Sequence, residues 1–386
     1  MSTPTQKPHP LLMIPGPIEF SDEVLQANAH PSMSHVSPQF VEIFGSTLEL
    51  LRKVFLAQTS AQPFIISGSG TLGWDFVAGN LVERDEHVLV LHTGYFADSF
   101  AECFETYGVR ATQLKAPIGA RPSLEEIECA LKQNKYKIIT ITHVDTSTGV
   151  LSDVKGIAAL VKNVSPETLV VVDGVCSIGS EELLFEEWGI DFVLTASQKA
   201  LGAPPGLCIL MAGERAMDVF HKRRSPPSSY YASLKKWLPI MQSYESRKPA
   251  YFATPNVQTV CALNVSLEQI LETSMPARFE AHKAASKMVK AAVERLGLKQ
   301  LTKSPHEAAN GMTAIWLPES VNLADILPKL VSKGIVFAGG LHKETATRYF
   351  RIGHMGITVT NLENGFLDKA IKGLEETFYE IQKCKV

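Results

Sequence analysis

The sequence contains no hydrophobic run long enough to cross a bilayer and no excess of positive charge. Its longest apolar runs, such as residues 169–172, are far shorter than the roughly 20 residues of a membrane-spanning helix. The 386 residues carry a net charge of −3, without the concentrated basic patch that nucleic acids or anionic membranes bind. The sequence therefore predicts a protein that binds neither nucleic acid nor a membrane.

Cysteine pairs with the spacing of metal or redox sites are also absent. The six cysteines are scattered and no CxxC occurs, which argues against a structural zinc. In a chain of this length they indicate reduced thiols of an intracellular protein rather than a disulfide framework. The first ten residues lack the apolar stretch of a secretory signal. The end, Cys384-Lys385-Val386, differs from a peroxisomal signal at its last residue. We expect a cytoplasmic protein without a bound metal, with import into mitochondria or peroxisomes as the open alternative.

What the sequence does contain, from about residue 60, is an alternation of short apolar segments with helical ones. The apolar segments are nearly continuous Val, Ile and Leu, as in strands of a mostly parallel sheet that helices cover on both faces. After Tyr251 the segments become longer helices, predicted over 257–273, 277–296, 322–333 and 361–382, and a few strands, which indicates a smaller α+β unit. We therefore predict an α/β protein with an arm over residues 1–20, a large domain over 21–255 and a small domain over 256–386. The predicted strands of the large domain are 64–66, 87–91, 137–142, 169–172, 191–195 and 207–211.

A glycine-rich turn lies between the first of these strands and the following helix. Gly68, Gly70 and Gly73 form the G-x-G-x-x-G pattern of dinucleotide-binding proteins. That pattern requires an acidic residue at the end of the next strand for the ribose, but this strand ends at His92 and Thr93. The turn therefore predicts a phosphate-binding helix N-terminus rather than a dinucleotide site, with a plain strand–helix turn as the alternative.

Lys199 and Asp173 follow two other predicted strands. Lys199 lies among small residues just before a rigid Pro-Pro-Gly turn, so we expect it to be buried, with a lowered pKa and a neutral amine that can form a Schiff base. Asp173 ends the most apolar strand, where a buried carboxylate needs a cationic partner such as a pyridinium nitrogen. A surface lysine and a strand-capping aspartate are the alternatives. Four tryptophans are predicted to be core residues: Trp74, Trp188, Trp237 and Trp316.

The order and spacing of several motifs resemble one known family. The chain is similar to the alanine–glyoxylate and serine–pyruvate aminotransferases, which are class V, fold-type I enzymes dependent on pyridoxal 5′-phosphate. The resemblance covers nearly the whole chain and implies a mostly parallel seven-stranded sheet in the large domain. The motifs that carry it are Gly68-Ser-Gly-Thr71, Thr146-Ser-Thr-Gly149, Asp173-Gly-Val-Cys-Ser177, Ser197-Gln-Lys199 with Pro204-Pro-Gly206, and Arg351-Ile-Gly353.

The resemblance implies two catalytic residues and a set of cofactor contacts. Lys199 would carry the cofactor and move the substrate α-proton, and Asp173 would pair with the pyridine nitrogen. Phe96 stands where the family often has a tryptophan stacked on the ring, and Thr71 where a histidine is common. The implied cofactor-binding residues are Ser69, Gly70, Thr71, Phe96, Thr146, Asp173, Gln198, Lys199, Tyr251 and Thr254.

Assembly and substrate binding follow from the same resemblance. Tyr251 and Thr254 would reach the cofactor phosphate of a neighbouring subunit, which implies a homodimer with shared active sites. Arg351 would bind the substrate α-carboxylate through its planar fork, with Gly16 beside it. A dicarboxylate substrate would need a second cation, for which Arg247 and Arg348 are candidates.

The implied reaction transfers the amino group of alanine to glyoxylate and yields pyruvate and glycine, as in glyoxylate metabolism and glycine biosynthesis. Serine–pyruvate or serine–glyoxylate transamination and a related lyase reaction are the alternatives. Desulfuration is disfavoured because residues 262–383 contain no cysteine to act as nucleophile. A phosphate-binding module without pyridoxal phosphate is the alternative outside this class.

Overall fold

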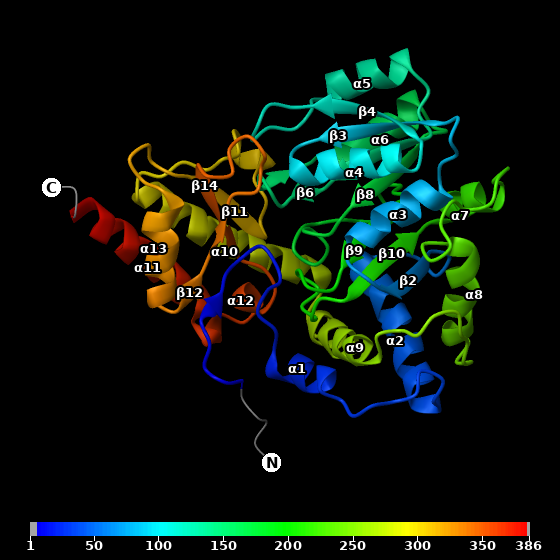
Figure 1. Cartoon of the computed structure of the whole chain (residues 1–386), viewed down its shortest axis with the longest axis horizontal. Helices are drawn as coiled ribbons and strands as arrows, with labels where there is room; N and C mark the ends of the chain where they lie inside the picture. The colour runs from blue at the N-terminus through cyan, green and yellow to red at the C-terminus, as the bar shows by residue number, and fades with distance from the viewer. Residues whose placement is uncertain (1–5, 384–386) are drawn as a thin grey trace.

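The structure, a computed structural model, describes residues 6–383. A seven-stranded sheet forms the centre of the larger domain, at the right of Figure 1. Six strands run in one direction, and β10 alone is antiparallel to its neighbours. The sheet confirms the expected α/β class. In spatial order its strands are β2 (Gln62–Ser67), β10 (Leu207–Ala212), β9 (Phe192–Ala196), β8 (Leu169–Asp173), β5 (Ile138–Thr142), β3 (His87–His92) and β4 (Arg110–Lys115).

Helices cover both faces of this sheet, as its continuous apolar strands require. The chain crosses the sheet in one direction through α3 (Thr71–Asn80) and α4 (Tyr95–Thr106), and returns through α5 (Leu124–Gln133) and α6 (Val154–Val164). Because parallel crossovers are right-handed, the two pairs lie on opposite faces. Parallel strands therefore bring their carboxyl ends, and the turns that follow them, to one edge of the sheet.

Of the helices that cover the lateral edge of the sheet at β2, only the one over residues 257–271 was predicted from the sequence. α2 (Pro38–Phe55) and α8 (Leu234–Glu245) contact β2, and α9 (Val257–Leu271) packs on α2 and on α1 (Asp22–Asn28). Ser37 caps α2 by accepting from the Phe40 amide, and a proline at the first helical position favours this start. The buried side chains of α9 belong to the same core as the sheet. The domain boundary at 255/256 stays a prediction.

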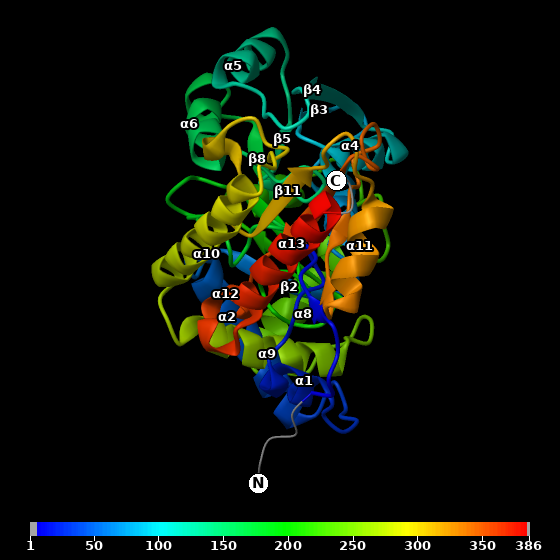
Figure 2. The same ribbon diagram turned by 90° about the vertical axis from the view of Figure 1, so that its left-hand side faces the viewer.

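The smaller domain has its own hydrophobic core and lies beside the larger one, as Figure 1 and Figure 2 show. An antiparallel three-stranded sheet is covered by helices, and the chain near its start adds a short parallel strand to β12. This pairing fixes the N-terminal segment against the small domain. The elements here are β1 (Leu11–Leu12), α10 (Met275–Arg295), β11 (Met312–Trp316), α11 (Leu323–Ser332), β12 (Ile335–Val336), β13 (Ala338–Gly339), β14 (Tyr349–Gly353), α12 (Ile357–Thr360) and α13 (Phe366–Lys383).

Two kinds of element differ from the prediction. β4 and α5 were not predicted, because β4 is a polar edge strand with no buried residue and so has no apolar run. The last helix begins at Phe366 rather than near Asn361, since Gly365 adopts a positive φ of 66° and interrupts the helical segment. The remaining short elements are β6 (Val144–Asp145), β7 (Val150–Leu151), α7 (Glu214–His221) and two 3₁₀ turns at Pro305–Glu307 and Leu362–Asn364.

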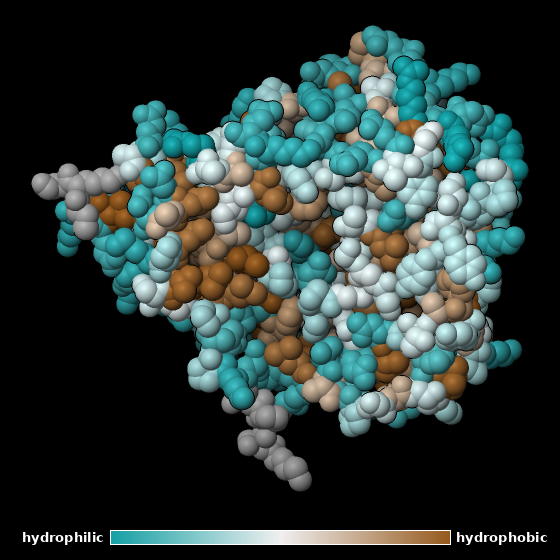
Figure 3. All heavy atoms as spheres, viewed as in Figure 1, coloured by the Kyte–Doolittle hydropathy of each residue, from teal (hydrophilic) through white to brown (hydrophobic). Residues whose placement is uncertain are grey.

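The surface differs between the two domains. Hydrophilic side chains cover most of the region over α5, whereas hydrophobic side chains gather over α11 and β12 of the small domain (Figure 3). Within α11, Val331 is exposed, and Leu323 and Leu327 are half-buried. Among residues 6–383, no helix is both long and apolar enough to cross a membrane.

Candidate active site

A cavity of about 230 Å³ lies where the strands β5, β8 and β9 end. It collects motifs that are more than 100 residues apart in the chain, because parallel strands end at one edge. Trp74, Thr142, Val144 and Val175 also line it and were not predicted as site residues. Eight of the ten predicted cofactor contacts line this cavity: Ser69, Gly70, Thr71, Phe96, Thr146, Asp173, Gln198 and Lys199.

One end of the cavity has the donors of an anion site. The turn between β2 and α3 places Gly70 and Thr71 at the helix N-terminus, and their amides have no acceptor within residues 6–383. A Cβ at Gly70 would lie only 2.7 Å from the side chain of Val175, so a larger residue would force this turn away. These two unpaired N–H groups fit a phosphate at the positive end of the helix dipole. Gln198 lines the cavity beside them; its Oε1, an acceptor, is buried without a partner in the described chain, so only its side-chain N–H₂ could donate to a phosphate.

Asp173 is a buried carboxylate that makes no ion pair in the described chain. It ends β8 and is 3% exposed; Oδ1 accepts from the Val175 amide at 3.1 Å and Oδ2 from the Trp74 indole at 2.9 Å. Burial raises the pKa of this carboxyl to about 6, although both hydrogen bonds and the charge of Lys199 in the same cavity act to lower it. No lysine or arginine of the described chain lies within ion-pair distance of it. The site therefore fits a ligand with a cationic group.

Lys199 lies in the turn after β9; the residue is 8% exposed, and its amine donates to the Pro15 carbonyl. Burial is the main cause that lowers the pKa of this amine, and the charge of Arg351 lowers it further. The Cys176 thiol and Asp173 act in the opposite direction. The expectation of a buried lysine with a lowered pKa is thus met by the geometry, and the neutral form is the nucleophilic one.

Gly16 lies directly against Lys199, although the sequence places it 183 residues earlier. Its φ is +103°, in the region that favours glycine, and a Cβ there would lie 2.7 Å from the Lys199 amine. The N-terminal segment therefore contributes backbone to the site, and a side chain at this position would displace the lysine.

Arg351 approaches the site from β14 of the small domain. Its Nε donates to the Gly339 carbonyl at 2.8 Å and its Nη1 to the Thr146 carbonyl at 3.0 Å. The guanidinium has no carboxylate partner among residues 6–383, and Nη2 makes no hydrogen bond there. The two bonds hold the fork in place, so it can present its free donors to an acidic ligand. Arg351 does not itself line the 230 Å³ cavity.

Tyr251 and Thr254 are not brought to the cavity of their own chain. Tyr251 is 64% exposed and contacts His35, with ring centroids 5.2 Å apart, and Thr254 is exposed as well. A single chain thus leaves these two predicted phosphate contacts outside its own site. Their role at a partner's site stays a prediction.

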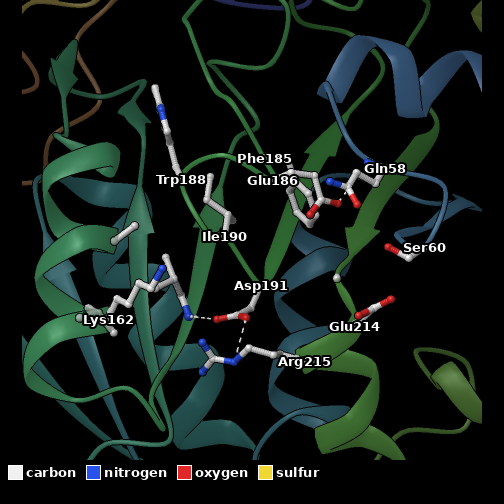
Figure 4. A pocket seen from close by; sticks show the side chains of 15 residues that line it. Gln58, Ser60, Lys162, Phe185, Glu186, Trp188, Ile190, Asp191, Glu214 and Arg215 are labelled. Atoms are coloured by element: carbon white, nitrogen blue, oxygen red, sulfur yellow. Dashed lines mark hydrogen bonds and ion pairs between the residues drawn. The ribbon is translucent and has the colours of Figure 1, made fainter.

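A second hollow, of about 380 Å³, lies at the other ends of the strands, where β8 and β9 begin (Figure 4). There Asp191 precedes β9; its Oδ2 accepts from the Val170 amide at 2.7 Å, and its Oδ1 lies 3.4 Å from Arg215 Nε. Burial raises the pKa of this carboxyl to about 6 as well. None of the predicted site residues lines this hollow. The described chain also brings no three His, Cys, Asp or Glu side chains together in a group that could hold a metal.

The fold and the amine–carboxylate cavity at its strand ends define a class, that of the pyridoxal-phosphate-dependent transferases. Within that class, the chain belongs to the aminotransferase class-V family, whose model matches residues 2–356. It is therefore an aminotransferase. The residues of the cavity fit the cofactor of that family, since they offer an amine, a carboxylate without an ion-pair partner and unpaired backbone donors for a phosphate.

Known proteins similar to this chain carry related names. The chain is 45% identical to alanine–glyoxylate aminotransferase 1 of Saccharomyces cerevisiae, over 91% of this chain and 93% of that protein. It is 32% identical to L-aspartate–glyoxylate aminotransferase of Paracoccus denitrificans, over 89% and 86%. Among solved structures, an alanine–glyoxylate aminotransferase from Nostoc sp. superposes with a TM-score of 0.88 at 26% identity, over 97% and 96%. The resemblance seen in the sequence is confirmed.

Proposed function

We propose that this aminotransferase binds pyridoxal 5′-phosphate at Lys199 and uses alanine and glyoxylate to form pyruvate and glycine. The observation that carries the proposal is that one cavity holds both a buried lysine amine, Lys199, and a buried carboxylate, Asp173, that makes no ion pair within the described residues. The donors of the Gly70–Thr71 turn supply the third requirement, a place for the phosphate. A phosphate-binding module without pyridoxal phosphate would need neither the buried amine nor the buried carboxylate.

Each group of the chain has a definite task in this proposal. When bound, the cofactor supplies an electron sink for the bond to the substrate α-carbon. Lys199 holds the cofactor and then, as a neutral amine, takes the proton from the α-carbon. Asp173 holds a proton on the pyridine nitrogen, and Thr146 and Phe96 keep the ring in place. Tight enclosure by these side chains fixes orientation, which accounts for much of the rate.

The substrate class is proposed from the charges near the site. Arg351 has free donors for one carboxylate. Arg247, a candidate second cation, is instead paired with Glu42 at 3.1 Å and Glu49 at 2.9 Å on α2. Arg351 is held against Thr146 of the cavity, whereas Arg247 is occupied elsewhere, which supports a monocarboxylic amino donor such as alanine. The name of the yeast relative, at 45% identity, supports the same choice.

We also propose a homodimer in the cytoplasm. Tyr251 is 64% exposed to solvent. A large aromatic side chain on the surface is typical of a contact with another chain, which supports the dimer. In such a dimer Tyr251 and Thr254 would complete the phosphate site of the partner. The five described cysteines form no disulfide, which supports a reducing compartment.

A half-reaction screen tests the proposal. The holoenzyme is mixed with one amino acid at a time, and loss of its visible absorbance is followed before any 2-oxo acid is added. Alanine should bleach the band fastest, and glyoxylate should restore it. If serine bleached the band faster than alanine, serine rather than alanine would be the preferred amino donor. A protein that gains no visible band with added pyridoxal phosphate would contradict the proposal as a whole.

A further inference from the structure

Trp74 contacts the carboxylate on which the proposed cofactor site depends. Its indole Nε1 donates to Asp173 Oδ2 at 2.9 Å, and the side chains are 6% and 3% exposed, so water does not compete for this bond. Trp74 lies on α3, the helix whose N-terminus forms the anion cradle. One helix therefore places both the phosphate donors and a donor to Asp173.

The chemistry of this donor is specific. An indole N–H can donate but cannot accept, and it does not titrate in the range where carboxyl groups do. The Val175 amide, which binds the other oxygen of Asp173 at 3.1 Å, has the same restriction. Both donors favour the ionised carboxylate over the protonated acid. Of the two, only the Trp74 bond depends on a side chain.

Packing fixes the direction of the indole. Its ring stacks on Phe100 of α4, with centroids 5.4 Å apart at 17°, and Phe100 stacks on Phe104 at 4.9 Å and 8°. All three side chains are buried. The N–H can therefore point at Asp173 without losing the entropy that a mobile donor would lose.

Burial works against the charge of Asp173. It raises the pKa of this carboxyl to about 6, and the hydrogen bonds from the Val175 amide and from Trp74 offset part of that rise. Without the indole donor, the carboxylate would become a weaker acid and could turn away from the cavity. A neutral Asp173 could not hold a proton on a pyridine nitrogen opposite it.

We propose that Trp74 is a positioning residue for the reaction: its indole N–H keeps Asp173 ionised and aimed at the pyridine nitrogen of the cofactor. The inference rests on the proposed function and names a residue outside the predicted site set. Trp74 would act through Asp173 and need not touch the substrate.

The test uses holoenzyme loaded with pyridoxal phosphate that is ¹⁵N-labelled in the ring. Two quantities are measured near pH 7: the NMR chemical shift of the ring nitrogen and the dissociation constant of the cofactor. Trp74→Phe removes the donor and keeps an aromatic ring. Trp237→Phe is the matched control, since Trp237 is 2% exposed and donates at 2.7 Å to the uncharged Tyr231 carbonyl. Replacing Trp74 by benzothienylalanine, which has sulfur in place of the N–H, changes the donor with little change of shape.

The wild type should show a protonated ring nitrogen. Trp74→Phe and the sulfur analogue should both move the signal toward the unprotonated position and weaken cofactor binding by about 10- to 100-fold, the range for a hydrogen bond to a charged group. Trp237→Phe should change neither quantity. If Trp74→Phe does not fold, the sulfur analogue decides the question.

Two outcomes would overturn the inference, and they can be told apart. A wild-type holoenzyme whose ring-nitrogen signal is the same in the Trp74 variants would refute the role of Trp74 and leave the proposed function standing. A wild-type protein that binds no pyridoxal phosphate would remove the proposed function and this inference with it.

Discussion

Two buried aspartates lie at opposite ends of the parallel strands, Asp173 at the carboxyl end of β8 and Asp191 before the start of β9, and they differ in whether a cation contacts them. Asp173 and Asp191 both accept a backbone amide, and burial raises the pKa of each to about 6. Asp191 has a guanidinium 3.4 Å away, whereas Asp173 has no cation within ion-pair distance in the described chain and faces a cavity with Lys199. A buried carboxylate with a shifted pKa is therefore not by itself an active site. The missing counter-charge is the informative feature.

The largest change in activity is expected for Lys199 in the 230 Å³ cavity, in contrast to Lys162 in the 380 Å³ hollow. Lys199→Ala should lower turnover by about 10³-fold or more, because both the attachment of the cofactor and the proton transfer are lost. Lys162→Ala, in the hollow around Asp191, should leave kcat unchanged. Steady-state rates with alanine and glyoxylate measure both variants, with circular dichroism to check the fold. Retained activity in Lys199→Ala would take this residue out of the mechanism.

The next largest effect separates the two aspartates themselves. Asp173→Asn should weaken cofactor binding by about 10²-fold or more, as expected when one member of a buried charge pair is neutralised. Asp191→Asn should leave cofactor affinity unchanged, because Asp191 lies in the other hollow. Cofactor titration measures both variants, with urea denaturation to check that each is folded. Equal cofactor affinity in both variants would show that Asp173 has no pyridinium partner.

The pH dependence of the free energy of unfolding also distinguishes Asp173 from Asp191. In the cofactor-free protein the folded pKa of Asp173, about 6, lies above the unfolded value of about 3.9, so the folded state binds the extra proton between these limits. Stability should therefore fall as the pH rises from about 4 to 6, by at most about 3 kcal/mol relative to Asp173→Asn.

Asp191→Asn should remove a slope of the same sign, since the folded pKa of Asp191 is also about 6. Bound cofactor should abolish or reverse the Asp173 contribution alone, because only that carboxylate gains a cation. Urea midpoints at pH 4 to 7, with and without pyridoxal phosphate, measure this difference. Parallel curves for wild type and Asp173→Asn would contradict the assigned environment.

The smallest of these effects concerns the two arginines. Arg351→Lys should raise KM for alanine about tenfold, because an ammonium cannot reproduce the planar fork that is fixed by the Gly339 and Thr146 carbonyls. Arg215→Lys, beside Asp191, should leave KM unchanged. Initial rates over a range of alanine concentrations provide the measurement. An unaltered KM in Arg351→Lys would mean that the α-carboxylate binds elsewhere.

The sequence predicted the site to the extent that the site depends on strand ends. Lys199, Asp173 and the Gly70–Thr71 turn each follow an apolar strand, and a parallel sheet brings such positions to one edge. Trp74 was predicted to be a core residue, and it is buried. Its bond to Asp173 joins positions 99 apart in the sequence, through side-chain directions that no local pattern encodes. Tyr251 and Thr254 stay predictions because a single chain does not complete their environment.

The most direct test of the central claim is to reduce the holoenzyme with borohydride and locate the cofactor by peptide mapping. A stable pyridoxyl group is expected on Lys199 alone, and none is expected after Lys199→Ala. Labelling of another lysine, or no labelling of a protein that is active with alanine and glyoxylate, would contradict this claim.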